Sequence, residues 1–597
     1  MDRNTFTGLF LIMIILAGSF YFLKPSEVEI KKAQEKEHLD SLKKPGATAS
    51  QKDTIKTAAV VPTVDSLALK GPFGTALTGT VSNTVLENEN LLITFSNKGG
   101  KISSVEVKGQ KTFNGKPLIL FDGDQNKFGL NLNVAGKVIN TNDLFFTPAK
   151  TANTLTMRAN YGANAYVEYV YDLKALSNKV GFKINLVGLQ QVIAGNNIGL
   201  NWEATLLQQE KSIESEHRYS APYYKYVNGD VDHLSVSKDE KEDLSKAKIQ
   251  WFSFKQHFFS AALIDKNGFD KGSLEVKIPT VPGQVKFYAA NMQLPYSPSG
   301  IQSYDMEFYF GTNKFSTLKD QGYELEKQVD LGYWPLKYVN RFIVLPVFNL
   351  LERFNWGYGL IIFALTILLK LALSPLTYKS YLSMAKMRVL KPEMDEIKAK
   401  VGEDNPTLVQ QEYLKLYKKA GVNPLGGCLP MLLQLPLVMA FFFFFPNLFE
   451  LRGESFLWMK DLSTYDEFIR FGVKLPFIGD HLSLMCVLMT ISTLIMTYFN
   501  NQVSGATGQM KYIGYIMPII FLGVLNSYPS GLNYYYFLAN LMTFGQQFLI
   551  RKMVDDDKIH ALIQQNKARP ADEKKKKSKF QQRLDDYMRQ QQQQTKK

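Results

Sequence analysis

Residues 356–375 read WGYGLIIFALTILLKLALSP, and the interpretation of the whole chain starts from them. All but one of these residues are uncharged. A helix rises about 1.5 Å per residue, so this stretch could cross most of a ~30 Å hydrocarbon core. The exception is Lys370, and a charge at the centre of a bilayer costs about 2.5–3.5 kcal/mol or more. Two interpretations stay open: its stem reaches the membrane surface, or the charge works inside the membrane.

Further apolar segments bring the predicted number of spans to six. Residues 5–23 predict an N-terminal transmembrane anchor over 1–24, with a cleaved signal peptide as the alternative. Four more spans are predicted at 427–445, 482–499, 512–527 and 532–550. The sequence Pro529-Ser530-Gly531 leaves room only for a tight turn, so the last two spans should form an antiparallel hairpin.

The segment between the first two spans has the composition of a soluble region. Residues 25–80 are rich in Lys, Glu, Ala, Thr, Ser and Pro, which predicts a flexible tether. Over 81–330, apolar and polar residues alternate, as in LLITFSNKGGKISSVEV at 91–107 with a turn at Gly99-Gly100. Alternation of this kind predicts antiparallel, half-buried strands, and so many residues can bury a core of their own. We therefore expect an all-β sandwich, followed by a helix at 315–329.

Residues 331–354 mix aromatic and charged side chains. Trp334, Tyr338, Phe342, Phe348 and Phe354 alternate with lysine, arginine and glutamate. This pattern predicts an amphipathic helix that lies in the membrane interface with its aromatic side down. A short buried helix is the alternative.

The distribution of charge predicts the orientation in the membrane. Segment 376–426 carries nine Lys/Arg, segment 448–481 carries four against six acids, and the tail 551–597 carries fourteen against seven. Basic loops favour the cytoplasmic side, which puts 376–426 and the tail in the cytoplasm. With six spans, the N-terminus is then also inside, and residues 25–330 are outside.

The two cytoplasmic segments have different patterns. Residues 377–424 show helical apolar spacing on both sides of GEDNP at 402–406, which predicts a helical hairpin; a solvated linker is the alternative. The tail 551–597 contains four consecutive lysines and a glutamine run and is too polar to fold alone. It is either simply solvated or makes electrostatic contacts with RNA or lipid.

Motifs for catalysis are missing from the sequence. We find no phosphate-binding loop of the G-x-x-x-x-G-K-[ST] or G-x-G-x-x-G kind, no H-E-x-x-H and no G-x-S-x-G. The six histidines are scattered, and the two cysteines, Cys428 and Cys486, both lie in apolar segments. We therefore predict no enzyme activity, no cofactor and no metal site.

Polar residues inside the predicted spans point to a pocket. Thr366 lies one helical turn before Lys370 and shares its face. Gln434 lies in the next span, and the last span adds Asn533, Tyr535, Tyr536 and Asn540. Facing lipid, these groups would lack hydrogen-bond partners, so an inward, hydrated pocket is expected.

Four motifs in the membrane region resemble the YidC family of membrane protein insertases. They are SPLTYKSYLSMAKMRVLKPEM (374–394), VNPLGGCLPMLLQLP (422–436), LFELRGESFLWMKDLS (448–463) and YPSGLNYYYFLAN (528–540). The anchor and the large β domain resemble the Gram-negative form of the family. The resemblance implies a multi-pass protein of the bacterial inner membrane with six transmembrane helices. It also implies a periplasmic β-supersandwich and a five-helix insertase core (355–550) around a hydrophilic groove.

The same resemblance implies a function and its residues. Family members insert membrane proteins and help them fold, alone or beside the Sec translocon, without a nucleotide of their own. Where the family usually has a groove arginine, this chain has Lys370, a point charge without the fork of donors that arginine offers. By position, the groove or exit path would be lined by Lys370, Thr366, Gln434, Leu435, Val438 and Tyr536. The last three could equally be packing residues.

The resemblance also implies partners for the cytoplasmic segments. The hairpin would contact substrate or the ribosome through Lys386, Arg388, Lys391, Lys415, Lys418 and Lys419, and the tail would help to hold the ribosome. Membrane lipids would surround the core. Two other functions stay open: a transporter of an anionic solute that binds Lys370, and a membrane-anchored carbohydrate-binding protein.

Overall fold

The structure is a computed structural model that describes residues 71–298, 302–402, 406–423, 429–504 and 509–568. The predicted anchor 1–24 and most of the tether lie outside the described residues. The tether was predicted to reach residue 80, and the structure describes the chain from residue 71. Phe73 is fully buried, packs edge-on against Tyr161 and belongs to the β-domain core. A single anchoring aromatic leaves no periodic signal in the sequence.

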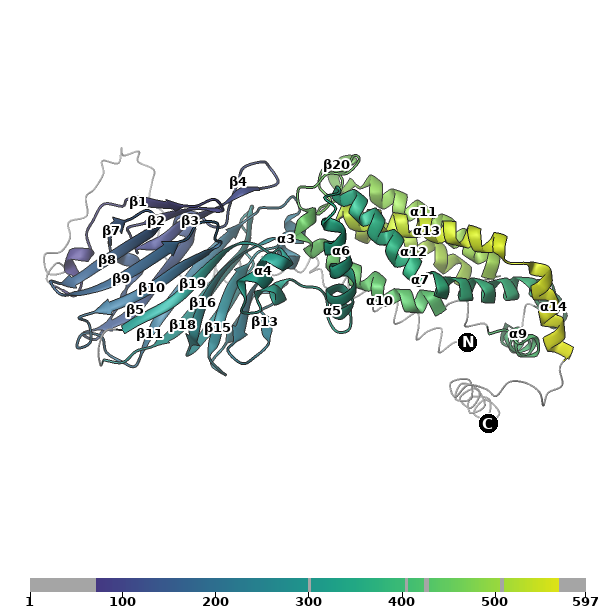
Figure 1. The fold of residues 1–597 in the computed structure, drawn as a ribbon, viewed down its shortest axis with the longest axis horizontal. Coiled ribbons are helices and arrows are strands. Elements are labelled where there is room, and N and C mark those ends of the chain that lie inside the picture. Colours follow the sequence, from purple (N-terminus) through teal and green to yellow (C-terminus); the bar gives the residue numbers. More distant parts are fainter. Residues whose placement is uncertain (1–70, 299–301, 403–405, 424–428, 505–508, 569–597) are drawn as a thin grey trace, which may run out of the picture.

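A β domain and a bundle of long helices lie end to end (Figure 1). The strands of the β domain are β1 (Asn83–Glu87), β2 (Leu91–Ser96), β3 (Lys101–Lys111), β4 (Pro117–Ile119), β5 (Asn126–Val134), β6 (Lys137–Asn140), β7 (Thr147–Lys150), β8 (Thr154–Gly162), β9 (Ala165–Leu173), β10 (Lys179–Val187), β11 (Asn197–Leu207), β12 (Ala221–Tyr226), β13 (Val231–His233), β14 (Glu240–Asp243), β15 (Ile249–Lys255), β16 (Phe259–Phe269), β17 (Lys271–Lys277), β18 (Gln284–Pro295) and β19 (Gln302–Thr312). They form sheets of four, nine and six strands in the orders β1-β2-β3-β4, β13-β12-β15-β16-β19-β10-β9-β8-β7 and β14-β17-β18-β11-β5-β6.

The predicted antiparallel sandwich is confirmed. Strand β10 alternates strictly between buried and half-buried residues and pairs antiparallel with both β9 and β19. The turn between β2 and β3 contains Gly99 and Gly100, both at positive φ, where glycine pays no steric penalty. Every second residue of this alternating pattern therefore lies on the face of the sheet that packs into the core, as expected for half-buried strands.

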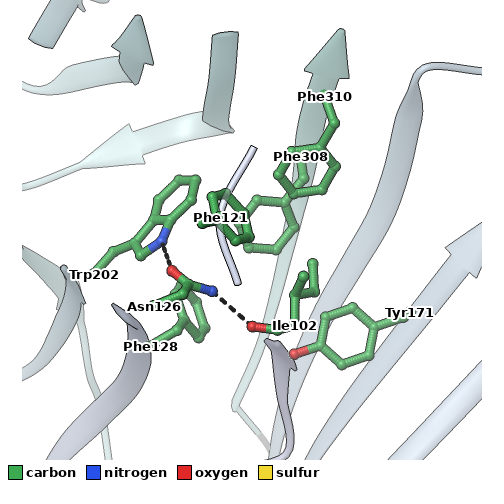
Figure 2. Close-up of a pocket in the computed structure, with 8 residues that line it drawn as sticks. All are labelled: Ile102, Phe121, Asn126, Phe128, Tyr171, Trp202, Phe308 and Phe310. Atoms are coloured by element: carbon green, nitrogen blue, oxygen red, sulfur yellow. Dashed lines mark hydrogen bonds between the residues drawn. The ribbon is translucent and has the colours of Figure 1, made fainter. Parts of the chain in front are cut away.

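Aromatic rings fill the centre of the sandwich. Trp202 packs against Phe254 at 4.6 Å between ring centroids, and its Nε1–H donates to Asn126 Oδ1 at 2.7 Å. Asn126 Nδ2 donates in turn to the Ile102 carbonyl at 2.6 Å (Figure 2). The cavity between these side chains measures about 10 Å³, barely room for one water, so the core is densely packed.

The helices are α3 (Ile213–Tyr219), α4 (Phe315–Gln321), α5 (Leu336–Val339), α6 (Leu345–Glu352), α7 (Tyr358–Val389), α8 (Lys391–Val401), α9 (Pro406–Ala420), α10 (Leu429–Phe444), α11 (Leu484–Ser504), α12 (Gln509–Leu525), α13 (Ser530–Met553) and α14 (Asp556–Ala568). Short 3-10 helices are η2 (Gly74–Ala76), η3 (Gly123–Gln125), η4 (Thr141–Asp143), η5 (Leu325–Gln328), η8 (Phe445–Asn447) and η9 (Phe449–Leu451); η6 (Asn340–Val344) is π-helical. A small hairpin joins β20 (Ile469–Leu475) to β21 (Gly479–Leu482). Helices are found at all five spans predicted after residue 355.

Two of the described helices are long and apolar enough to cross a membrane. They are Tyr358–Val389 and Leu484–Asn501, and two shorter apolar helices cover Gln434–Asn447 and Tyr512–Leu525. The last predicted span, at 532–550, lies in α13, whose polar residues dilute its apolar character. Length and composition in the described residues therefore support fewer spans than the six expected.

Helix α7 continues through Pro375, the last residue of the apolar stretch 356–375. Proline has no N–H, so the carbonyl four residues earlier, that of Leu371, loses its helical donor. Ser374 supplies a replacement: its hydroxyl donates to the Leu371 carbonyl at 2.7 Å. The first helix of the predicted hairpin is consequently split, and its first part belongs to α7 and its second to α8.

Helices α5, η6 and α6 run across the end of the bundle that faces the β domain (Figure 1). Trp334 and Phe342 are exposed on this segment, the first to 73%. Phe348 differs from the expectation because it is fully buried between Phe444 and Tyr358. The segment thus has one face on the core and one aromatic face outside it.

The tail was expected not to fold alone, and its first part folds against the hairpin. Ile559 and Ile563 of α14 are buried with Tyr417 of α9 and Tyr381 of α7 in one apolar cluster. Arg388 of α7 pairs with Asp556 of α14 at 2.6 Å. Hairpin and α14 lie at the end of the bundle opposite to the β domain (Figure 1).

Buried polar contacts join the β domain to the bundle. Arg452, in the loop after η9, pairs with Glu210 at 2.7 Å and donates to the Lys111 carbonyl at 2.6 Å. His257 Nε2 lies 2.7 Å from the Pro446 carbonyl. Because Arg452, Glu210 and His257 are largely buried, the two parts of the molecule share a packed interface, here called the junction.

Candidate functional site

The polar groups of the bundle meet where α7 packs on α13. Lys370 of α7 is only 7% exposed, and its Nζ donates to Thr543 Oγ1 of α13 at 2.8 Å. Gln546, about one turn further along α13, donates from Nε2 to the Lys370 carbonyl at 3.0 Å. The lysine is therefore turned toward α13 and not toward the end of the span. Side-chain hydrogen bonds of this kind hold helices together in a membrane.

The charge of Lys370 has no carboxylate beside it. None of the ion pairs found among the described residues includes Lys370, and Thr543 takes only one of its three N–H donors. A buried cation with spare donors is costly, and such residues in membrane spans are by default candidates for function. In chemical terms, the two remaining N–H donors of the Lys370 ammonium are suited to an anionic or carbonyl group.

Thr366 contributes less to this site than its position suggests. It is fully buried one turn before Lys370, as the spacing predicts. Its hydroxyl, however, donates to the Ile362 carbonyl of its own helix at 2.7 Å. On α13, Asn540 donates to Ser492 Oγ at 2.9 Å and Thr493 Oγ1 at 2.8 Å of α11 and makes no contact of this kind with Lys370.

Of the remaining predicted groove residues, Val438 and Tyr536 lie at the contact of α10 with α13, while Gln434 and Leu435 lie further along α10. The Tyr536 hydroxyl of α13 donates to the Val438 carbonyl of α10 at 3.1 Å. Gln434 is half-buried, and Leu435 is 52% exposed, which excludes a core packing role for Leu435. The predicted residues thus separate into a lysine site on α7 and an apolar wall on α10, and α13 connects the two. Tyr536 and Thr543 are seven residues apart on one face of α13, roughly 10 Å.

Sequence reasoning missed two members of the lysine site, Thr543 and Gln546. The available signal for Thr543 was its spacing from two predicted pocket residues. Thr543 follows Asn540 by three residues, and Asn540 follows Tyr536 by four, as expected for residues on one face of a helix. Among the described residues, no cluster of His, Cys, Asp or Glu is suited to hold a metal ion.

The basic residues of the hairpin are not equivalent. Arg388 is occupied by Asp556, and Lys415 pairs with Glu412 at 2.6 Å. Lys391, Lys418 and Lys419 are exposed, and Lys386 is half-buried. Within the described part of the hairpin, fewer of the predicted basic contact residues are therefore free of an acidic partner than the sequence suggested.

Comparison with known proteins identifies two matching family models. Residues 350–558 match the family described as "60Kd inner membrane protein", and residues 83–350 match "YidC periplasmic domain". Together the two models cover the helical bundle and the β domain.

Curated relatives resemble the chain over nearly its full length. The membrane protein insertase YidC of Parabacteroides distasonis is 38% identical over 606 aligned residues, which cover 96% of this chain and 95% of that protein. The protein of the same name from Bacteroides fragilis is 38% identical, covering 96% and 95%. A crystal structure of an active YidC insertase is similar with a TM-score of 0.33 and 18% identity over 78% of this chain and 92% of that one. These relatives do not favour the transporter or the carbohydrate-binding alternative.

Proposed function

The chain belongs to the YidC family and is a membrane protein insertase of the inner membrane with a periplasmic domain; from this premise we propose that Lys370 is the cation that receives the substrate. Its substrates are nascent membrane proteins. The observation that carries the proposal is the buried Lys370 ammonium, bonded to Thr543 and lacking a carboxylate.

The physical problem is to move a polar segment across about 30 Å of hydrocarbon. A cation partway across attracts acidic residues of a short translocated segment and lowers the cost of their entry. In the structure, the Thr543 hydroxyl accepts a hydrogen bond from one of the N–H donors of Lys370. A substrate carboxylate that takes the place of this neutral hydroxyl gains a charge-assisted hydrogen bond. No covalent chemistry is needed.

The wall on α10 gives the apolar part of the substrate its way out. Leu435 is exposed on the surface of α10, and Gln434, Val438 and Tyr536 continue from it toward α13. A substrate helix that slides along this wall leaves water for lipid, which is worth roughly 25 cal/mol per Å² of apolar surface. Because Lys370 is buried against Thr543, loading requires α7 and α13 to separate enough to expose it.

The topology that fits this mechanism has six spans, with hairpin and tail in the cytoplasm. Helices α8, α9 and α14 lie at the opposite end of the bundle from the β domain, and the basic residues cluster there (Figure 1). A periplasmic β domain then favours a cytoplasmic position for the hairpin. The exposed aromatic face of 331–354 supports an interfacial helix at the other side.

Partners on the cytoplasmic side follow from charge. The exposed Lys391, Lys418 and Lys419, together with the basic tail 551–597, favour contact with ribosomal RNA. Cooperation with the Sec translocon is proposed from the family alone. Both contacts would deliver the substrate near the hairpin, at the cytoplasmic end of α7.

The test compares Lys370→Ala with Lys370→Arg in proteoliposomes that insert two substrates, which differ only in acidic or neutral residues in the translocated tail. We expect Lys370→Ala to reduce insertion of the acidic substrate about tenfold and the neutral one much less, and Lys370→Arg to retain both, since one charge contact is worth about 1.4 kcal/mol or more. Equal insertion of the acidic substrate by Lys370→Ala and the unaltered protein would refute the role of the charge. Circular dichroism and thermal unfolding would check that the variants are folded.

A further inference from the structure

The β20–β21 hairpin exposes a group of apolar side chains next to the membrane spans. Phe477, in its turn, is 81% exposed, and Phe468, Ile469, Val473 and Leu475 are exposed as well. Contiguous apolar surface of this kind is rare on a protein in water and marks contact with a partner or a membrane. The hairpin needs an explanation because it belongs to neither the β-domain core nor the lysine site.

Helix α12 holds the hairpin firmly in place. Asn526, directly after α12, is fully buried and donates from Nδ2 to the carbonyls of Ile478 and His481 at 2.8 and 2.7 Å. Gly523, in the last turn of α12, lies so close to the turn that a Cβ there would meet the Phe477 carbonyl at 2.7 Å. The exposed apolar groups are therefore fixed at the end of a span and do not sit on a loose loop.

The basic residues of the hairpin pair with acidic side chains. Lys474 lies 4.0 Å from Glu214 of α3, and Arg470 lies 3.6 Å from Glu467. Glu467 in turn pairs with Lys211 of the β domain at 3.1 Å. The charged side of the hairpin is thus connected to the periplasmic β domain, which leaves the apolar residues for another environment.

The apolar part of α12 is too short to cross a bilayer alone. It covers Tyr512–Leu525, about 21 Å, which is less than a hydrocarbon core of ~30 Å. Ile516, Ile520 and Val524 are exposed at intervals of four residues and form one stripe along α12. This stripe ends where the hairpin begins, so the exposed residues of the hairpin continue the apolar surface of the span.

We propose that the β20–β21 hairpin is immersed in the periplasmic leaflet of the membrane. Phe468, Val473 and Phe477 lie among the upper acyl chains, while Arg470 and Lys474 stay at the level of the lipid phosphates and the β domain. The hairpin thereby completes the hydrophobic thickness that α12 lacks. The inference requires α12 to cross the membrane, but it is independent of any contact between Lys370 and substrate.

The test measures contact with lipid directly in the full-length protein. Phe477→Cys and Val473→Cys are made with Cys428→Ser and Cys486→Ala, labelled with a nitroxide, and reconstituted in vesicles of phosphatidylethanolamine and phosphatidylglycerol. Val138→Cys, an exposed apolar position on β6 of the β domain, is the matched control. Collision rates with oxygen, which concentrates in hydrocarbon, and with a polar nickel chelate, which is excluded from it, are read by electron paramagnetic resonance.

We expect the ratio of oxygen to nickel collision rates at both hairpin positions to exceed that at Val138 by about threefold or more, because hydrocarbon excludes the polar chelate. A ratio equal to that of the control would place the hairpin in water and overturn the proposal. Protection from both reagents would also overturn it, in favour of a protein partner or a second copy of the chain. Insertion activity of each labelled variant, measured in the same vesicles, verifies its fold. Loss of the proposed activity of Lys370 would leave the ratio of oxygen to nickel collision rates unchanged.

Discussion

His257 is a buried neutral base at the junction. Its Nε2 faces the Pro446 carbonyl at 2.7 Å, and Nδ1 has no hydrogen-bond partner among the described residues. A proton on Nδ1 would be buried without an acceptor, and burial, with Lys255 and Arg452 nearby, lowers the pKa of His257 to about 3. The ring stacks on Phe258 at 3.8 Å, which leaves little room for water.

This pKa predicts how stability depends on pH. The folded pKa lies below the ordinary value of 6.5, so the unfolded chain binds more protons between pH 6.5 and 3. The contribution of His257 to the free energy of unfolding is therefore present above pH 6.5 and is lost as pH falls toward 3. His257→Gln keeps a donor but cannot titrate. Thermal unfolding of both proteins from pH 7 to 4 should show a steeper acid loss for the unaltered protein, by at most about 1.4 kcal/mol per pH unit. Parallel curves would contradict this assignment.

Single residues were predictable from the sequence only where they broke a pattern. Lys370 interrupts an apolar run, so its importance was visible. Thr543 was not, because threonine is an ordinary residue in spans and nothing in the sequence says which helix faces Lys370. For Thr366, the sequence correctly predicted the same helix face as Lys370. It could not predict that the Thr366 hydroxyl donates to a carbonyl of its own helix.

Among the elements, α7 depends on a local repair at Pro375. Leu371 is exposed at membrane depth, and its carbonyl would have no donor without the Ser374 hydroxyl. An unsatisfied backbone carbonyl in lipid is costly. One side chain therefore keeps α7 helical across a residue that usually ends helices.

Substitutions at these two positions should be coupled. We expect Ser374→Ala to destabilise the protein by about 1–2 kcal/mol, because it leaves the Leu371 carbonyl unpaired in lipid. In a Pro375→Ala background, the restored N–H bonds that carbonyl, and Ser374→Ala should cost little. The free energies of unfolding of the four proteins, in mild detergent with increasing denaturing detergent, give the coupling. Additive effects would show that Ser374 does not compensate for the proline.

Elements were predictable where a period extended over many residues. The alternation of apolar and polar residues in β10 predicted both that the segment is a strand and which of its faces is buried. The apolar runs predicted where the spans lie. The end of α7 was misjudged because proline normally stops a helix, and the serine that compensates precedes it without any periodic signal. Helix α14 was missed because its stability comes from the apolar cluster with α7 and α9, which a polar local composition cannot reveal.

At the scale of the whole molecule, Arg452 is central to the junction. Its guanidinium is almost fully buried, pairs with Glu210, and lies 4.9 Å from the Phe259 ring. The contact joins residues that are 242 positions apart in the sequence. No pattern in the sequence could predict it, because both residues look like ordinary surface charges.

Removing one partner of this pair should loosen the junction more than removing both. Arg452→Ala leaves Glu210 buried without its cation, which should cost about 3–5 kcal/mol. Arg452→Met combined with Glu210→Gln should recover at least half of that loss. The measurement is protease resistance of the chain between β19 and α5 in the reconstituted protein, with Lys183→Ala, at an exposed surface pair, as the control. Equal protease sensitivity of the single and double variants would show that the pair does not determine docking.

The continuity of α7 makes it a lever between the two ends of the molecule. Gly359 fixes its periplasmic end, since a Cβ there would meet the Phe456 ring at 2.1 Å. If the helix pivots by about 10° at that point, Lys370 moves about 3 Å and Val389 about 8 Å. A displacement of the helical hairpin at the far end of α7 thus produces a displacement of Lys370 that is roughly threefold smaller. Large movements at the hairpin end of α7 would become small movements at the Lys370 charge.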